Sequence, residues 1–436
     1  MKTTTTESQV RETIGQLAPE EGLWRVDRPA SREGAEPPIE TRVYRSWTEL
    51  KALLPAWEEI LNANPALSIF STPEWLGSWW EAFGAARPLR VLAFFDHREM
   101  LLGVVPLYQE QATAAGFGRL WCLRLVGDGS MDSDNLDLVL RPGFERACCR
   151  AFLQWLAGCR GWDLCSLNTL PADSVGARAL RPELAARRWP LRRTESPNAA
   201  IEFPPTWQSY VDGLANSFRP LVTRYPRRLS NRFTMRVYRS DDPGRLPEAL
   251  TLLFRLHQKR WHLAHEPGSF ASAERQDFYG RMAAAFLERG WLEFWFLELD
   301  GRAVAAEFCF AYRGSVYLLQ EGFDPDFAAD KVGYALRAAL LKYFLESGAR
   351  RYDFLGGFNV HKRNWGATPG IYQNLCFARP HSLGSCHIAL DAWGAQGKEW
   401  LRQHLPAAAW SALQRVKGSM NGARHPQPPQ EGLSDE

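Results

Sequence analysis

The clearest hydrophobic pattern of the chain runs from residue 291 to residue 355 and changes from the period of strands to that of a helix. Three strand-like runs come first, separated by the turns Asp300-Gly301 and Arg313-Gly314. They are Trp291–Leu299, Ala303–Tyr312 and Ser315–Phe323. After a polar loop, apolar residues recur at helical spacing from Leu336 to Phe344, and Gly348 ends the helix. Because Arg351–Leu355 is a further short strand, the pattern predicts a helix that crosses over between parallel strands.

The first half of the chain shows the same alternation. Strands are expected at 90–95, 101–108, 120–126, 136–140, 164–167 and 199–203, with helices at 144–157 and 178–187. We therefore predict an α/β protein with two lobes in tandem, 41–204 and 205–385, which meet near Pro204-Pro205. Residues 1–40 and 421–436 are polar and are predicted to be disordered, and a helical segment is expected at 386–420.

Composition narrows the class of protein. The 436 residues, 45% of them hydrophobic, are enough for two domains with their own cores. A net charge of +3 gives no global field that would favour nucleic acid or a membrane surface. The eight cysteines contain no C-x-x-C pair and lie mostly in apolar runs, which is typical of buried, reduced thiols. Because no apolar run approaches the length of a membrane span or a secretory signal, we expect a cytoplasmic protein.

Short motifs in the second half occur in the order and spacing of a known family. They are His257-x-x-Arg260-Trp261, Tyr317…Gly322-x-Asp324, Gly333 at a helix start, Asp353-Phe354-Leu355-Gly356 and Lys362…Trp365. Over residues 45–380 the chain resembles the BioF2-like or CelD/BcsL acetyltransferases of the GNAT superfamily. The resemblance implies tandem GNAT-like lobes with mixed sheets flanked by helices. It also implies an N-acyltransferase that moves an acetyl or other acyl group from acyl-CoA to an amine on a small molecule or glycan, in polysaccharide or cell-envelope biosynthesis.

The loop before the long helix is the predicted site of the coenzyme A pyrophosphate. Backbone N–H groups and the helix dipole attract phosphate at a helix N-terminus, and GNAT proteins place a Q/R-x-x-G-x-G/A loop there. Asp330 stands where that loop has Gln or Arg, and its negative charge would repel a pyrophosphate. The neighbouring positive charge of Lys331 could compensate for it. The residues assigned to the cofactor are Lys331, Val332, Gly333, Tyr334 and Ala335. The alternative is an ordinary helix that Asp330 caps.

Three carboxylates are candidates for catalysis. Acylation of an amine needs a base, because the ammonium form, with a pKa near ~10, cannot attack. Glu307 stands among small residues on one face of its strand, where burial would raise its pKa towards that of a useful base. The alternative is that Glu307 forms an ion pair with a neighbouring arginine. Glu321 ends the third strand and is expected on the face of Tyr317, either as the base or as a solvated side chain. Asp353 lies near the C-terminal end of the last strand, where open α/β sheets bind ligands.

The resemblance also implies a set of substrate-binding residues. His257, Arg260 and Trp261 lie on a predicted helix, where His257 and Arg260 share a face. Asp324 and Lys362 complete the set. Lys362 belongs to the basic trio His361, Lys362 and Arg363, which forms either an anion cradle or a solvated turn. A histidine on a helix is more often structural than a metal ligand, so we expect no metal.

An arginine run leaves a second function open. Seven arginines lie between residues 219 and 239 with few acids among them, which suits a polyanion. FemABX-type aminoacyl-tRNA-dependent peptide transferases share the tandem-lobe plan and are the alternative function. Pro220 and Pro226 are expected to break any long helix here, so we expect a solvated or lobe-packing surface and no nucleic-acid partner. A third alternative is a GNAT-like lobe that binds a partner without catalysis, which the acid at Asp330 would fit.

Overall fold

The computed structural model describes residues 39–114, 118–263 and 269–404, and within these only the backbone of 260–263, 269 and 395–404. The segments predicted to be disordered are 1–40 and 421–436. Apart from residues 39 and 40, they lie outside the described part of the chain. The side chains of Arg260 and Trp261 lie outside it as well.

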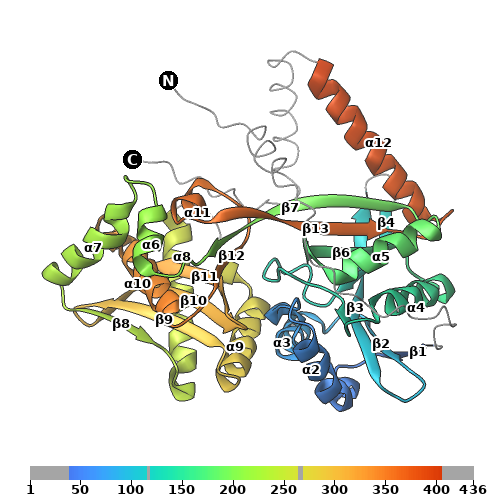
Figure 1. Ribbon diagram of the computed structural model, residues 1–436, viewed down its shortest axis with the longest axis horizontal. Helices are drawn as coiled ribbons and strands as arrows, with labels where there is room; N and C mark the ends of the chain where they lie inside the picture. The colour runs from blue at the N-terminus through green and yellow to red at the C-terminus, as the bar shows by residue number, and fades with distance from the viewer. Residues whose placement is uncertain (1–38, 115–117, 264–268, 405–436) are drawn as a thin grey trace. The chain divides into compact units, whose positions relative to one another are not determined.

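A mixed sheet of 13 strands runs through the described residues (Figure 1). Its N-terminal strands are β1 (Glu40–Tyr44), β2 (Leu89–Phe95), β3 (Leu101–Ala114), β4 (Gly118–Leu125), β5 (Val139–Leu140), β6 (Leu164–Pro171) and β7 (Leu191–Glu202). The later strands are β8 (Met235–Arg239), β9 (Leu292–Leu299), β10 (Arg302–Tyr312), β11 (Ser315–Phe323), β12 (Arg351–Gly356) and β13 (Thr368–Phe377). Their order is β1-β2-β3-β4-β6-β13-β7-β12-β11-β10-β9-β8, and β5 pairs with β3.

Helices flank the sheet. In the N-terminal lobe they are α2 (Leu54–Ala63), α3 (Pro73–Phe83), α4 (Glu145–Gly158) and α5 (Val175–Ala186). The C-terminal lobe has α6 (Trp207–Gly213), α7 (Arg219–Arg232), α8 (Leu246–Leu263), α9 (Ala273–Glu288), α10 (Val332–Glu346) and α11 (Val360–Asn364), and α12 (Leu383–His404) follows. Short 3₁₀ turns are η1 (Thr48–Leu53), η2 (Ile69–Ser71), η3 (Pro243–Arg245), η4 (Ser269–Ala271) and η5 (Pro325–Asp330).

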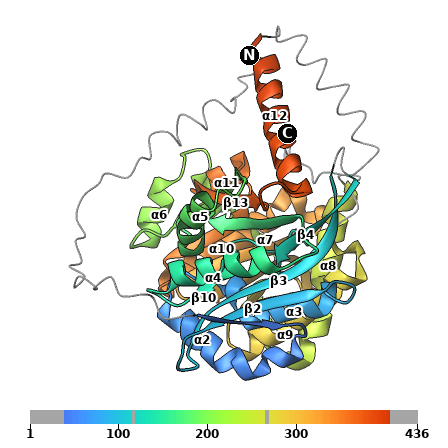
Figure 2. The same ribbon diagram turned by 90° about the vertical axis from the view of Figure 1, so that its right-hand side faces the viewer.

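The two lobes repeat one plan, which confirms the predicted α/β fold with two lobes in tandem. In each lobe antiparallel strands are followed by a crossover helix and a parallel strand. In the N-terminal lobe α4 leads from β4 to β6, which pair in parallel, and Figure 2 shows β2, β3 and β4 side by side. In the C-terminal lobe α10 leads from β11 to β12, and the parallel pairing ends at Tyr317 and Asp353. Beyond that pair β11 continues to Phe323 without a partner on β12.

The lobes share the sheet because strands cross between them. β7 pairs with β12 on one side and with β13 on the other, and β13 in turn pairs with β6 (Figure 1). A strand close to the described C-terminus therefore lies inside the N-terminal sheet. The backbone hydrogen bonds of these strands make the two lobes one structural unit.

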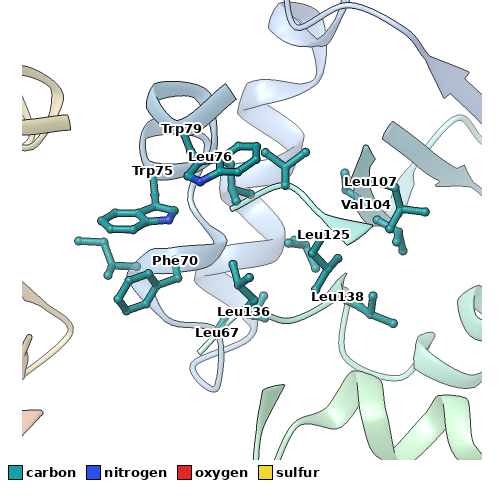
Figure 3. Close-up of a cluster of buried hydrophobic side chains, with 14 of the residues drawn as sticks. Leu67, Phe70, Trp75, Leu76, Trp79, Val104, Leu107, Leu125, Leu136 and Leu138 are labelled. Atoms are coloured by element: carbon teal, nitrogen blue, oxygen red, sulfur yellow. The ribbon is translucent and has the colours of Figure 1, made fainter. Parts of the chain in front are cut away.

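Aromatic side chains fill the core where the lobes meet. Trp75 on α3 lies among buried leucines (Figure 3), and its ring centroid is 4.6 Å from that of Phe70, 5.2 Å from Phe278 and 5.6 Å from Phe310. Its indole N–H donates to the Oγ of Ser133 over 2.9 Å, so burial leaves no polar atom of this side chain without a partner. Truncation of a buried tryptophan of this kind costs about 3–5 kcal/mol.

The prediction that two prolines break the helix after residue 219 is wrong. Arg219–Arg232 is one 14-residue helix, α7. Pro220 stands in the first turn, where the missing N–H would have no intrahelical acceptor, and Pro226 removes a single hydrogen bond. Val222 and Leu229 are buried on one face in the cluster that contains the core residues of α10. This tertiary packing outweighs the local cost of Pro226.

Candidate active site

The helix α10 begins where the phosphate loop was predicted. Lys331 is its N-cap, with a left-handed φ of 54°, and the Lys331 side chain makes no capping hydrogen bond. The first intrahelical bond runs from the N–H of Ala335 to the carbonyl of Lys331 over 3.0 Å. As in every α-helix, the N–H groups of the first turn have no intrahelical acceptor, so their dipoles attract an anion. A Cβ placed on Gly333 would meet only Cδ1 of Phe323, at 3.9 Å, so packing does not require glycine there.

Asp330 is not the cap of α10, so the ordinary-helix alternative fails in that detail. Its carboxylate forms an ion pair with Arg232 at the C-terminal end of α7, and Lys331 takes the cap position. The negative charge that departs from the GNAT pattern is therefore paired with an arginine from another helix. The first turn of α10 thus has Lys331 and Arg232 as neighbouring cations.

A buried ion cluster lies one helical turn further along α10. The Arg337 guanidinium donates through Nε to Glu307 over 2.9 Å, and the Tyr352 hydroxyl donates to the other Glu307 oxygen over 3.0 Å. Burial raises the pKa of Glu307 to about 7, although Arg337 acts in the opposite direction. The arginine-pair alternative for Glu307 is therefore confirmed. Sequence reasoning missed Arg337, whose signal is a single charge within the apolar run Val332–Leu341.

Glu321 joins the same cluster because of a β-bulge. Phe308 faces Gln320 and Cys309 faces Leu318, so β11 carries one extra residue, Leu319. The extra residue turns Glu321 away from the face of Tyr317, where it was predicted, and towards α10. There Arg337 donates to Glu321, whose side chain is 30% exposed, whereas that of Glu307 is 3% exposed.

His361 completes this cluster from α11. Its Nε2 lies 3.1 Å from a terminal nitrogen of Arg337, and because a guanidinium only donates, Nε2 is the acceptor. The imidazole ring lies edge-on to Tyr334 of the first α10 turn, with 5.6 Å between the ring centroids. Sequence reasoning had placed His361 only in the basic trio. The structure connects the candidate carboxylates to the helix start through Arg337 and this ring.

Asp353 lies on the opposite face of the sheet, where β11 and β12 stop pairing. One carboxylate oxygen accepts the N–H of Leu355 over 2.8 Å, and Leu355 has a left-handed φ of 60°. The other oxygen is 3.3 Å from a guanidinium nitrogen of Arg351. Burial raises the pKa of Asp353 above its ordinary value, while Arg351 acts to lower it. Asp353 is thus not in hydrogen-bond contact with the Glu307 cluster in the described structure.

Lys362 holds the end of β12. Its ammonium donates to the carbonyls of Phe354 over 3.0 Å, Gly356 over 2.5 Å and Gly357 over 3.2 Å. Asp134 of the N-terminal lobe accepts the N–H of Gly356 over 2.7 Å. The solvated-turn alternative for Lys362 therefore does not describe this side chain. These contacts fix the chain that leads from β12 to His361.

His257 and Asp324 make contacts that hold the elements of the C-terminal lobe together. His257 on α8 is buried, and a Cβ on Gly322 would come within 2.7 Å of the His257 nitrogen, so α8 lies directly on β11. Asp324 pairs with Lys259 over 3.0 Å and with Arg302. Burial would raise the pKa of Asp324, but the hydrogen bonds from Lys259 and Arg302 outweigh it, and the pKa is lowered.

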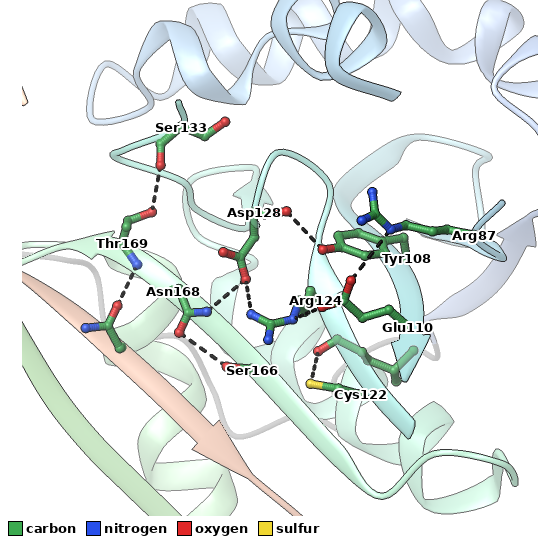
Figure 4. Close-up of polar contacts among 12 residues, drawn as sticks. Arg87, Tyr108, Glu110, Cys122, Arg124, Asp128, Ser133, Ser166, Asn168 and Thr169 are labelled. Atoms are coloured by element: carbon green, nitrogen blue, oxygen red, sulfur yellow. Dashed lines mark hydrogen bonds and ion pairs between the residues drawn. The ribbon is translucent and has the colours of Figure 1, made fainter. Parts of the chain in front are cut away.

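In the N-terminal lobe a network of polar side chains joins β4 to β6 (Figure 4). Arg124 of β4 is 2.6 Å from Glu110 and 3.0 Å from Asp128. The Asn168 amide of β6 donates to the same Asp128 carboxylate over 2.8 Å. This network links β4 to β6, whereas the predicted site residues all belong to the C-terminal lobe.

Two further observations bear on cofactors and location. Across the described ranges there is no group of three or more His, Cys, Asp or Glu side chains that could hold a metal ion. Within the same residues, no helix combines the length and apolar character needed to cross a membrane.

Comparison with known proteins identifies the class of the C-terminal lobe. Residues 216–363 match the family described as acetyltransferase (GNAT) domain, which is about a third of the chain. This segment is therefore a GNAT acetyltransferase domain. No curated protein matches the sequence. The narrower assignment to the BioF2-like or CelD/BcsL acetyltransferases stays a prediction.

One solved structure shares the fold over most of this chain. A crystal structure of FemX matches with a TM-score of 0.53 and 12% identity, covering 80% of this chain and 99% of that one. The tandem GNAT protein from the clavulanic acid biosynthesis pathway matches with a TM-score of 0.44 and 12% identity, covering 79% and 100%. At such identities the likeness to FemX concerns the fold alone.

Proposed function

We propose that the protein is an N-acyltransferase that moves an acetyl or other acyl group from acyl-CoA to an amine. The observation that carries this proposal is the first turn of α10, which lacks a side-chain cap, has space at Gly333 and lies within the matched GNAT domain. The coenzyme A pyrophosphate would accept hydrogen bonds from the backbone between Lys331 and Ala335. Following the family resemblance, the proposed acceptor is an amine on a polysaccharide or cell-envelope precursor.

The reaction joins the amine nitrogen to the thioester carbonyl carbon. The nitrogen lone pair attacks, the C–N bond forms, the C–S bond breaks and coenzyme A leaves as its thiolate. The amine must lose a proton, and Glu321 is the proposed acceptor because its side chain is 30% exposed, against 3% for Glu307. Glu307 would then act as a positioning residue that holds Arg337, which in turn orients Glu321.

Calorimetric titration with coenzyme A tests the proposed cradle. Wild type and Gly333→Ala are expected to bind alike, because a Cβ at residue 333 meets only Phe323, at 3.9 Å. Gly333→Glu adds a carboxylate beside the pyrophosphate and is expected to weaken binding at least about tenfold, or roughly 1.4 kcal/mol. Equal affinity in all three proteins, or no binding by wild type, would refute the proposal.

A further inference from the structure

The outward face of α7 concentrates positive charge. Val222 and Leu229 are buried towards α10, while Arg224, Arg227 and Arg228 are exposed on the other side of the helix. Arg227 and Arg228 stand three and four positions after Arg224, so both side chains lie next to that of Arg224 on the surface of the helix. We call Arg224, Arg227 and Arg228 the α7 arginine face. Its existence depends on α7 being continuous through Pro226.

No carboxylate of the described residues forms an ion pair with the α7 arginine face. The neighbouring Arg232 is paired with Asp330, and Arg239 is 3.2 Å from Glu293. Residues 213–240 contain neither Asp nor Glu, although the whole chain has a net charge of only +3. Three cations held side by side repel one another unless an anion neutralises them. The positive charge of the α7 arginine face is therefore a local feature that the net charge of the whole chain does not reveal.

The chemistry of the face selects a phosphate-bearing partner. All seven cationic side chains between residues 219 and 239 are arginines, and the planar guanidinium binds phosphate oxygens in pairs. From Arg224 to Arg228 the helix rises about 6 Å, a length over which a nucleic-acid duplex carries about two phosphates per strand. The other outward residues include Ser230 and Asn231, without the large apolar side chains that helices insert into membranes.

We infer that the α7 arginine face binds the phosphate backbone of a nucleic acid. The contact is with phosphates, so it does not select a base sequence. α7 is tied to the candidate site through Arg232 and Asp330, so the bound backbone lies beside the start of α10. This inference does not rest on the proposed acyl donor, since acyl-CoA needs one pyrophosphate cradle and no extended cationic face.

Fluorescence anisotropy with a labelled RNA hairpin that ends in a single-stranded 3′ segment tests the inference on the full-length protein. The variant R224Q/R227Q/R228Q removes the face and keeps side chains that favour helix. The control R98Q/R119Q/R188Q removes three exposed arginines of the N-terminal lobe and leaves the face intact. Both variants lose the same charge, and thermal unfolding monitored by circular dichroism checks that each remains folded.

Wild type and control are expected to bind the hairpin and to lose roughly 20–40-fold in affinity between about 50 and about 200 mM salt, if three phosphates are neutralised. The R224Q/R227Q/R228Q variant should bind at least about tenfold more weakly at the lower salt and lose most of the salt dependence. Absence of wild-type binding at low salt, or equal weakening in both folded variants, would overturn the inference. Binding to phosphatidylglycerol vesicles without binding to the hairpin would also overturn it.

Discussion

At the scale of single residues, Arg337 explains how two acids can face each other across neighbouring strands. Glu307 and Glu321 are register partners on β10 and β11, an arrangement of like charges that is unfavourable on its own. Arg337 contacts both carboxylates, and its guanidinium lies 5.2 Å from the centre of the Phe354 ring. The composition of the strand indicated that Glu307 would be buried. The arginine could not be assigned to it, because the partner comes from a helix 30 positions away.

The two glutamates are expected to differ in catalysis. With acetyl-CoA and glucosamine as probes, Glu321→Gln should lower the rate of coenzyme A release about 100-fold or more, because a positioned base contributes about 10²–10⁴-fold. Glu307→Gln keeps a hydrogen-bond acceptor for Tyr352 and should reduce the rate much less. The rates are measured with a thiol reagent from about pH 6 to about pH 9. Full activity of Glu321→Gln over that range would exclude it as the base.

Asp137 should make stability depend on pH. It is buried, its Oδ1 accepts hydrogen bonds from Ser174 and from the N–H of Leu138, both over 2.8 Å, and burial raises its pKa from 3.8 to about 7. Because the pKa of Asp137 is higher in the folded than in the unfolded state, its contribution to the free energy of unfolding is greatest below pH 3.8. That contribution is lost as the pH rises through about 7.

Asp137→Asn keeps the acceptor oxygen and removes the titration. Between about pH 5 and about pH 8 the free energy of unfolding should therefore fall more steeply in wild type than in Asp137→Asn, by up to about 1.4 kcal/mol per unit of pKa shift. Urea denaturation at both pH values measures the difference. Parallel pH dependence of the two proteins would contradict a raised pKa.

At the scale of elements, the regular spacing of apolar residues predicted strands and helices correctly. The places where a strand or helix departs from regular geometry were not predicted. The strands expected at 291–323 and the helix after Gly333 correspond to β9, β10, β11 and α10 within one or two residues. The bulge at Leu319 left no mark in the pattern of apolar residues, yet one extra residue reverses the face of every side chain beyond it. The continuity of α7 was also missed, because packing of Val222 and Leu229 overrides a local rule about proline.

Two glycines near the site should respond in opposite ways to the same added methyl group. A Cβ on Gly322 would lie 2.7 Å from the backbone nitrogen of His257, so Gly322→Ala must push α8 away from β11. We expect Gly322→Ala to lower the free energy of unfolding by about 1–3 kcal/mol, the usual cost of overpacking. Gly333→Ala is the matched control, since its nearest contact is 3.9 Å. Urea denaturation that finds both variants equally stable would contradict this account of the contact between α8 and β11.

At the scale of the whole molecule, the sequence predicted two lobes of one plan but not the strands that pass between them. β13 pairs Cys376 with Ser166 of β6 and with Arg192 of β7. Pairings across about 200 positions have no local signature, because any apolar strand can occupy the middle of a sheet. The order of strands in the sheet is therefore a property of the assembled chain rather than of either lobe.

This arrangement predicts that the lobes unfold together. A fragment of residues 39–204 would contain β6 and β7 without β13 between them, leaving two unpaired edges in the middle of the sheet. We expect the full chain to show a single cooperative transition in calorimetry and the fragment to show none, because the unpaired backbone groups and the exposed core faces remove its stability. Adding residues 350–404 as a separate chain, which supplies β12 and β13, should restore part of the transition. A cooperative transition in the fragment alone would mean that the N-terminal lobe folds independently of β13.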